Sequence, residues 1–207
     1  VGLAAGALLQ ERASGQANTE TQRVFAASER EIKEITALTY GMITNIDDRV
    51  GLVMDALRQS GADRTTVVIF TSDHGDFMGD HGLMLKGPLH YEGLVRVPFI
   101  WSDPAAQDGA QVRRDLGSSI DIGASVLARA GIAPPNGVQG KALFAPSGQG
   151  IESGRDAVLI EDNQQRTFMG FSKPVWLRTL VTDTHRISVY GQGDRGELYD
   201  LAADPDE

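Results

Sequence analysis

The feature that most constrains the fold is a long helical pattern that leads into a short apolar strand. Between Glu29 and Ser60, apolar residues recur at spacings of three and four, which is the period of an amphipathic helix. Gly61 follows the last of them and predicts the helix end. The segment Thr66–Thr71 is β-branched and continuously apolar at its centre. Such a run predicts a strand buried on both faces, as in an αβ unit of a parallel sheet.

The rest of the chain changes character near its middle. Residues 97–101 predict a second strand, and residues 118–130 predict a second amphipathic helix that Gly131 ends. A segment rich in Gly, Pro, Ser and Gln then predicts a surface connection. Beyond it, short strand candidates separated by turn residues predict an antiparallel meander, at 157–160, 178–182, 186–189 and 197–201. We therefore predict an α/β part over residues 1–136, followed by a linker and a small β-rich subdomain over 137–207.

Composition excludes several classes of function. The 207 residues include 19 Lys and Arg against 28 Asp and Glu, a net charge of −9, which argues against a nucleic-acid partner. No apolar run approaches the roughly 18–20 residues that span a bilayer, so no membrane partner is expected. The absence of cysteine rules out disulfides, thiolate metal sites and cysteine nucleophiles within this chain. The compartment stays open between cytoplasm, periplasm and the outside of the cell.

Carboxylate and imidazole side chains that could bind a metal or act in catalysis lie directly after the predicted strand. Asp73, His74, Asp76, Asp80 and His81 lie within nine residues, with glycines among them. Ligands of open parallel sheets bind just beyond the carboxyl ends of the strands. Glycine permits a left-handed backbone, which can fold the segment back and aim neighbouring side chains at one point.

A carboxylate beside an imidazole suits a divalent cation, so Asp73 and His74 are candidate metal ligands. Two ligands are too few for a closed site, and others would have to come from elsewhere. Lys86 is the next polar candidate, because an ammonium near a metal is favourable where an oxyanion such as sulfate or phosphate lies between them. The alternative is that these acids only cap turns, as most such Asp residues do. The residues alone leave both interpretations open.

Several segments together resemble the sulfatase family of the alkaline-phosphatase-like superfamily. They are Thr71–Asp76, Gly79–Gly82, Lys86-Gly87, Tyr91-Glu92, Arg96–Pro98 and the ending Glu197–Leu201 with Asp204–Glu207. The resemblance extends over about residues 28–207. It implies part of an alkaline-phosphatase-like sheet flanked by helices, followed by a small C-terminal antiparallel β subdomain.

The resemblance also implies roles for individual residues. Asp73 and His74 match the second pair of metal ligands, and Lys86 matches the lysine that contacts the sulfate and its leaving oxygen. Many sulfatases have Asn at the position of His74 and hold calcium. The Asp-His form also occurs in phosphonate and phosphodiester hydrolases of the superfamily, which often use manganese or zinc. Calcium is therefore the first expectation, with manganese or zinc as alternatives. Asp76 and His81 have no firm catalytic counterpart and are expected to be structural.

The chain departs from the family in one respect. Sulfatases use a formylglycine nucleophile, which is made from Cys or Ser in a Cys/Ser-x-Pro-x-Arg motif near the start of the protein. This chain has no Cys and no such serine motif. We therefore expect the C-terminal half of a sulfuric ester hydrolase, inactive by itself, with a small sulfate ester as the substrate of the whole enzyme. The alternatives are a phosphonate monoester or phosphodiester hydrolase and a non-catalytic sulfatase-like domain.

A few further residues carry weaker expectations. His90 is a candidate at the substrate mouth, with an ordinary surface histidine as the alternative. Glu92 and Arg96 are four apart and predict a helical ion pair. His185 is expected in an exposed hairpin turn. A sheet that lacks part of its cover would expose apolar surface, which favours association, so a homo-oligomer is also an expectation.

Overall fold

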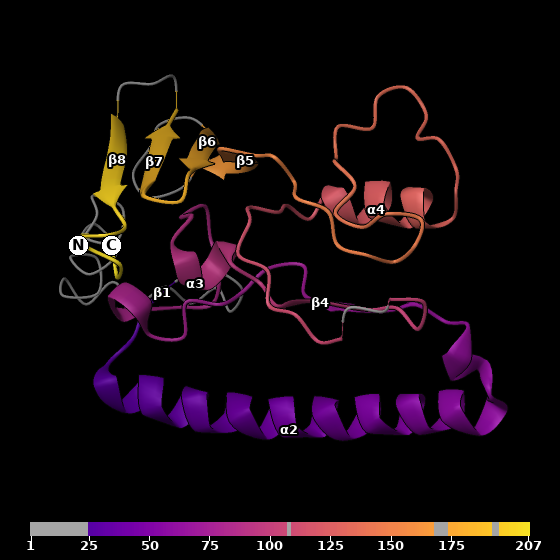
Figure 1. Ribbon diagram of the computed structural model, residues 1–207. Coiled ribbons are helices and arrows are strands. Elements are labelled where there is room, and N and C mark those ends of the chain that lie inside the picture. Colours follow the sequence, from indigo (N-terminus) through magenta and orange to yellow (C-terminus); the bar gives the residue numbers. More distant parts are fainter. Residues whose placement is uncertain (1–24, 107–108, 168–173, 192–194) are drawn as a thin grey trace. The chain divides into compact units, whose positions relative to one another are not determined.

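The computed structural model describes residues 25–106, 109–167, 174–191 and 195–207 (Figure 1). The helices are α2 (Glu29–Ser60), α3 (Glu92–Val95) and α4 (Asp121–Arg129). The strands are β1 (Phe25–Ala26), β2 (Val68–Thr71), β3 (Leu83–Met84), β4 (Phe99–Ser102), β5 (Val158–Thr167), β6 (Pro174–Val181), β7 (His185–Tyr190) and β8 (Arg195–Asp200). Single 3₁₀ turns lie at Ala62–Arg64 and Asp80–Gly82.

The long helix α2 has the bounds that the sequence predicts, because both ends are set by local residues. The Ser28 N–H donates to Glu31 Oε2 at 2.7 Å and the Glu31 N–H donates to Ser28 Oγ at 3.4 Å, which is a capping box. At the other end Gly61 adopts a left-handed backbone with φ of 71°, and its N–H donates to the Arg58 carbonyl. Figure 1 shows α2 as one uninterrupted helix.

The chain divides into two compact units. Unit 1 comprises residues 1–46, 74–97 and 159–207, and unit 2 comprises residues 47–73 and 98–158. The predicted boundary between residues 136 and 137 stays a prediction, and the first 24 residues of its α/β part lie outside the described residues.

In unit 2 the predicted strand forms, but its surroundings differ from the prediction. β2 pairs with β4 in antiparallel register, with Ile69 opposite Trp101 and Phe70 opposite Ile100. Phe70 and Ile100 are both exposed. The expectation of a parallel pairing buried on both faces is therefore wrong for this strand. A run of apolar residues reports a local preference for extended backbone, whereas direction and cover depend on distant parts of a protein.

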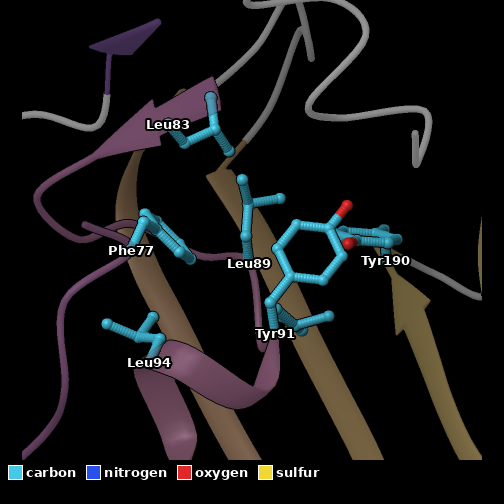
Figure 2. Close-up of a cluster of buried hydrophobic side chains, with 7 residues drawn as sticks. Phe77, Leu83, Leu89, Tyr91, Leu94 and Tyr190 are labelled. Atoms are coloured by element: carbon cyan, nitrogen blue, oxygen red, sulfur yellow. The ribbon is translucent and has the colours of Figure 1, made fainter. Parts of the chain in front are cut away.

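Unit 1 contains the predicted C-terminal meander. The order of its sheet is β5-β6-β7-β8, and the pairs β6–β7 and β7–β8 are antiparallel. The chain is thus a mixed α/β structure with a C-terminal four-stranded antiparallel sheet. Buried side chains from this sheet and from the segment after β2 form one core, shown in Figure 2: Phe77, Leu83, Leu89, Tyr91, Leu94, Leu177 and Tyr190. None of the helices in the described part of the chain is long and apolar enough to cross a membrane.

Candidate functional site

The turn that carries the candidate ligands is built around Gly75. Its N–H donates to the Leu94 carbonyl at 2.7 Å, and a Cβ added at Gly75 would collide with the Gly93 carbonyl oxygen. A side chain at residue 75 would therefore push the turn away from the backbone of α3. This close approach of two backbones gives a physical reason for glycine after His74.

Asp76 folds the following segment back on itself. Its Oδ1 atom accepts hydrogen bonds from the backbone N–H groups of Met78 and Leu85, both at 3.0 Å. Met78 and Leu85 have positive φ values of 48° and 65°, which non-glycine residues adopt only in tight turns. The Asp76 carboxylate compensates by satisfying both amides, which confirms its expected structural role. The result is a closed loop that ends immediately before Lys86.

This loop brings His74 and Lys86 together. The Lys86 Nζ atom lies 2.7 Å from His74 Nε2, although twelve positions separate the two residues. The other ring nitrogen, Nδ1, lies 2.7 Å from the Gly75 carbonyl oxygen. A carbonyl oxygen can only accept, so Nδ1 carries a proton and Nε2 presents its lone pair to the ammonium. His74 therefore directs an acceptor nitrogen, which could equally ligate a metal, toward the position held by Lys86.

Asp73 is the other candidate ligand. It is exposed, and the Ser72 hydroxyl lies 3.4 Å from its Oδ1 atom. Asp73 is the last residue of its segment in unit 2, whereas His74 is the first of its segment in unit 1. No group of three or more metal-ligating side chains is found among the residues that the structure describes. The described residues therefore offer part of a metal site, and the joint action of Asp73 and His74 stays a prediction.

His90 lies inside the protein. It is 6% exposed, and its Nδ1 atom lies 2.9 Å from the Thr179 hydroxyl on β6. The alternative of an ordinary surface histidine is therefore wrong, because the core of unit 1 encloses the ring. Its predicted contact with substrate stays a prediction, and its described contacts are with the protein. Burial lowers the pKa of His90 to about 4, with Asp162 opposing that shift and Arg186 adding to it.

The residues beside His90 form an aromatic and ionic cluster. The Tyr91 ring stacks on His81, with centroids 3.9 Å apart, and meets Tyr199 edge-on. The Arg186 guanidinium lies over both tyrosines, 5.5 Å from the Tyr91 centroid and 5.3 Å from that of Tyr199. Arg186 also forms a buried ion pair with Glu207. His81 and Tyr199 are thus packed within this cluster, and burial lowers the pKa of His81.

Sequence reasoning missed the polar interior of the C-terminal sheet. Thr179 on β6, and Arg186 and Ser188 on β7, are all buried, whereas Ile187 between the last two is exposed. Apolar alternation alone points Ile187 inward and its neighbours outward. The available signal was the alternation of polar residues with a period of two, which also marks one face of a strand.

Two smaller expectations near the site, for Glu92 with Arg96 and for His185, are met. Arg96 forms an ion pair with Glu92 one helical turn away. His185 is exposed beside the turn between β6 and β7, as expected. Trp101 stacks on Phe144, with centroids 4.3 Å apart and rings inclined by 13°, so it is a packing residue.

The fold is that of the sulfatases, which belong to the alkaline-phosphatase superfamily. The model of the family described as Sulfatase matches residues 8–132, and the model described as N-sulphoglucosamine sulphohydrolase, C-terminal, matches residues 79–207. The chain therefore belongs to the sulfatase family, as the motifs predicted.

Individual relatives agree with this assignment. An arylsulfatase from Clostridium perfringens is 31% identical over 183 residues, covering 87% of this chain and 36% of that protein. The phosphonate monoester hydrolase of Agrobacterium radiobacter superposes with a TM-score of 0.76 at 30% identity, covering 87% of this chain and 37% of its own. A structure described as being in complex with its substrate D-glucosamine-2-N,6-O-disulfate gives a TM-score of 0.68 at 25% identity, covering 79% and 33%. The chain thus spans about a third of the length of these relatives.

Proposed function

We propose that this chain is the C-terminal portion of a metal-dependent sulfuric ester hydrolase, in which Lys86 contacts the sulfate group and its leaving oxygen. One observation carries the proposal: the Lys86 ammonium lies 2.7 Å from Nε2 of His74, a candidate metal ligand. A cation held beside a metal ligand is favourable once a bound anion lies between the charges. Membership of the sulfatase family supports sulfate as that anion.

The chemistry of the donors fits a divalent metal in part. Asp73 would contribute a carboxylate oxygen, and His74 would contribute Nε2, because Nδ1 is engaged with the Gly75 carbonyl. When bound, the metal would neutralise the anion and lower the pKa of a nucleophile. We place the remaining ligands and the formylglycine nucleophile in a part of the whole enzyme that lies outside these 207 residues.

Lys86 would act on the leaving group. Its ammonium has three N–H donors, and the donor that contacts His74 Nε2 here would be released once that nitrogen binds the metal. Cleavage of the S–O bond leaves negative charge on the ester oxygen, which an N–H donor stabilises as the charge develops. The closed loop built on Asp76 would hold this donor in place before the substrate arrives.

The test of this role is Lys86→Ala in the whole enzyme. We expect kcat for an aryl sulfate to fall about 10²–10³-fold, with the melting temperature unchanged, since Lys86 is exposed and contributes no packing. Lys33→Ala is the matched control, because Lys33 is an exposed lysine paired only along the surface of α2, with Glu29. A near-normal rate in Lys86→Ala would refute the role.

Metal dependence has its own test. Treatment with a chelator should abolish turnover by the whole enzyme, and titration with Ca²⁺, Mn²⁺ and Zn²⁺ should identify the ion that restores it. Calorimetry with the same ions gives a readout that does not depend on activity, and His74→Ala should weaken binding of the restoring ion. Full activity after complete removal of metal would contradict the proposal. The 207-residue chain by itself should not hydrolyse aryl sulfates.

The second candidate function is phosphonate monoester or phosphodiester hydrolysis. The imidazole of His74 favours it, because imidazole suits manganese and zinc better than calcium. The similarity to a phosphonate monoester hydrolase also supports it. Assays of one preparation on an aryl sulfate, an aryl phosphonate and a phosphodiester separate the two functions. We expect the highest kcat/KM on the sulfate, and a much higher value on a phosphorus ester would reverse the ranking.

A further inference from the structure

The segment that follows Lys86 is anchored in the interior of unit 1. Lys86 itself is exposed, but Pro88, Leu89, His90 and Tyr91 are all buried. The Leu89 N–H donates to the Gly87 carbonyl at 2.8 Å, which makes the link between Lys86 and the buried residues short and tight. The position of the Lys86 backbone is therefore determined by how the residues after it are held.

One anchor is a chain of buried hydrogen bonds to the C-terminal sheet. His90 Nδ1 lies 2.9 Å from Thr179 Oγ1, and Thr179 Oγ1 lies 2.7 Å from Ser188 Oγ. Thr179 is 0% exposed, so its hydroxyl has to be satisfied within the protein. Removing one member of such a chain leaves its partners buried and unpaired, which costs more than the bond itself contributes.

A second anchor acts one residue further along. The backbone N–H of Glu92 donates to Glu207 Oε2 at 3.1 Å, and the Glu207 carboxylate is also paired with Arg186 of β7. The first anchor thus reaches β6 through Thr179 and β7 through Ser188, and the second reaches β7 through Glu207 and Arg186. In the apolar core of unit 1, Leu89 and Tyr91 of this segment cluster with Tyr190 of the sheet (Figure 2).

We infer that the C-terminal sheet positions Lys86 for catalysis, and that Thr179, through His90, is the positioning residue. The inference rests on the proposed role of Lys86. The flexible side chain of Lys86 has His74 as its described hydrogen-bond partner, so accurate placement of the ammonium depends on its backbone. A donor displaced by about 1 Å from a developing charge can lose a large part of its effect on rate.

The experiment compares Thr179→Val, Thr179→Ser and Thr184→Val in the whole enzyme. Valine at residue 179 keeps the shape and removes the hydroxyl, whereas serine keeps the hydroxyl. Thr184→Val is a matched control, because Thr184 Oγ1 also contacts a histidine Nδ1, that of His185 at 2.9 Å, but at an exposed turn. We expect Thr179→Val to lower kcat about tenfold, with a smaller change in KM. Thr179→Ser should retain most of the rate, and Thr184→Val should retain all of it.

Two further readouts separate positioning from a general structural effect. If Thr179 acts through Lys86, the loss should be larger for sulfate esters with poor leaving groups, such as phenyl sulfate, than for 4-nitrophenyl sulfate. Adding Thr179→Val to Lys86→Ala should cause no further loss of kcat, since the group being positioned is already absent. A loss that is independent of the leaving group, or that multiplies with Lys86→Ala, would overturn the inference.

Hydrogen exchange tests the anchor without any activity. Thr179→Val should speed exchange of the backbone amides of residues 89–92, and Thr179→Ser and Thr184→Val should not. Unchanged exchange in Thr179→Val would overturn the inference even if the wild-type enzyme proved unable to hydrolyse sulfates. That inability would refute the proposed function instead. A wild-type enzyme that depends on Lys86 but not on the Thr179 hydroxyl would refute only the inference.

Discussion

The two units of the chain are stabilised in different ways. Unit 1 has an apolar core, in which Phe77, Leu89, Tyr91 and Leu177 are almost completely buried. In unit 2 the apolar side chains on β2 and β4 are half-buried or exposed, and Ile100 is 57% exposed. Among the described residues of unit 2, the fully buried side chains are polar: Asp121 and Ser125 are both 0% exposed.

Buried or half-buried carboxylates hold the loops of unit 2. Asp121 accepts hydrogen bonds from the backbone N–H groups of Ser118 and Lys141, both at 2.8 Å, and pairs with Arg155. Asp103 pairs with Arg129 in a similar way. Such hubs, each a buried carboxylate with its hydrogen-bond and ion-pair partners, fix the geometry of loops. They bury little apolar area, however, and burial of apolar area is the main source of stability in most domains. We infer that unit 1 is stabilised mainly by its apolar core, whereas the stability of unit 2 depends on individual buried carboxylates and their partners.

The largest expected effect is the loss of the Asp121 hub. Asp121→Ala leaves the Arg155 guanidinium and two backbone amides without their acceptor, and breaking a buried pair from one side costs about 3–5 kcal/mol. Urea unfolding of the 207-residue chain should report a loss of this size. Asp156→Asn is the control, because Asp156 is a neighbouring exposed acid. A loss below about 1 kcal/mol in Asp121→Ala would mean that the hub does not hold unit 2 together.

In unit 1 the buried polar residue to compare with Asp121 is His90. Its burial should make the free energy of unfolding depend on pH. Its folded pKa is about 4, below the ordinary value near 6.5, because burial favours the neutral ring. Between these values the unfolded chain binds more protons than the folded chain. The contribution of the buried His90 to the free energy of unfolding should therefore be fully present above pH 6.5. It should be lost as the pH falls toward 4, by about 3 kcal/mol in all.

A variant that cannot titrate isolates this contribution. His90→Asn keeps an amide that can bond the Thr179 hydroxyl, and we expect the loss of stability between pH 6.5 and 4 to become clearly smaller. Asp162 and Arg186 are the charged groups that act on His90, and both stay in place in this variant. His185→Asn is the control, because His185 is exposed. An unchanged pH profile in His90→Asn would show that the ring does not titrate as its burial implies.

The sequence predicted the features that are encoded locally. The ends of α2 follow from Ser28, Glu31 and Gly61, which act within one helical turn of each boundary. The strands of the C-terminal meander follow from alternation and turn residues. The proximity of His74 and Lys86 was expected from the family motif, and the Asp76 loop gives its physical basis.

Features that depend on distant partners could not be predicted. His90 is buried because it meets Thr179, which lies 89 positions further along the chain. The partner and cover of β2 depend likewise on non-local contacts, and a run of apolar residues does not specify them. The sequence also did not indicate which face of β7 is buried, because the buried face carries Arg186 and Ser188 rather than Ile187.

Aromatic packing offers a smaller test of unit 2. Trp101 and Phe144 are stacked, and such pairs contribute about 0.5–1.5 kcal/mol beyond the area they bury. Phe144→Leu keeps an apolar side chain and removes the stack, so the free energy of unfolding in urea should fall by about 1 kcal/mol. Ile100→Leu should have almost no effect, because Ile100 is exposed. Equal losses in both variants would contradict the exposure of β4.

The smallest effect should come from the exposed ion pair of unit 1. Glu92 and Arg96 are one helical turn apart, in the same kind of contact that Asp121 and Arg155 make in the interior of unit 2. Water and salt screen exposed charges, so Arg96→Gln should cost only about 0.3–0.5 kcal/mol at low salt and nothing measurable at 1 M salt. A double-mutant cycle with Glu92→Gln measures the pair itself, and the Asp121–Arg155 cycle is its buried counterpart. Similar coupling energies for the two pairs would show that burial does not distinguish them, and the contrast between the units would then have to rest on the apolar core alone.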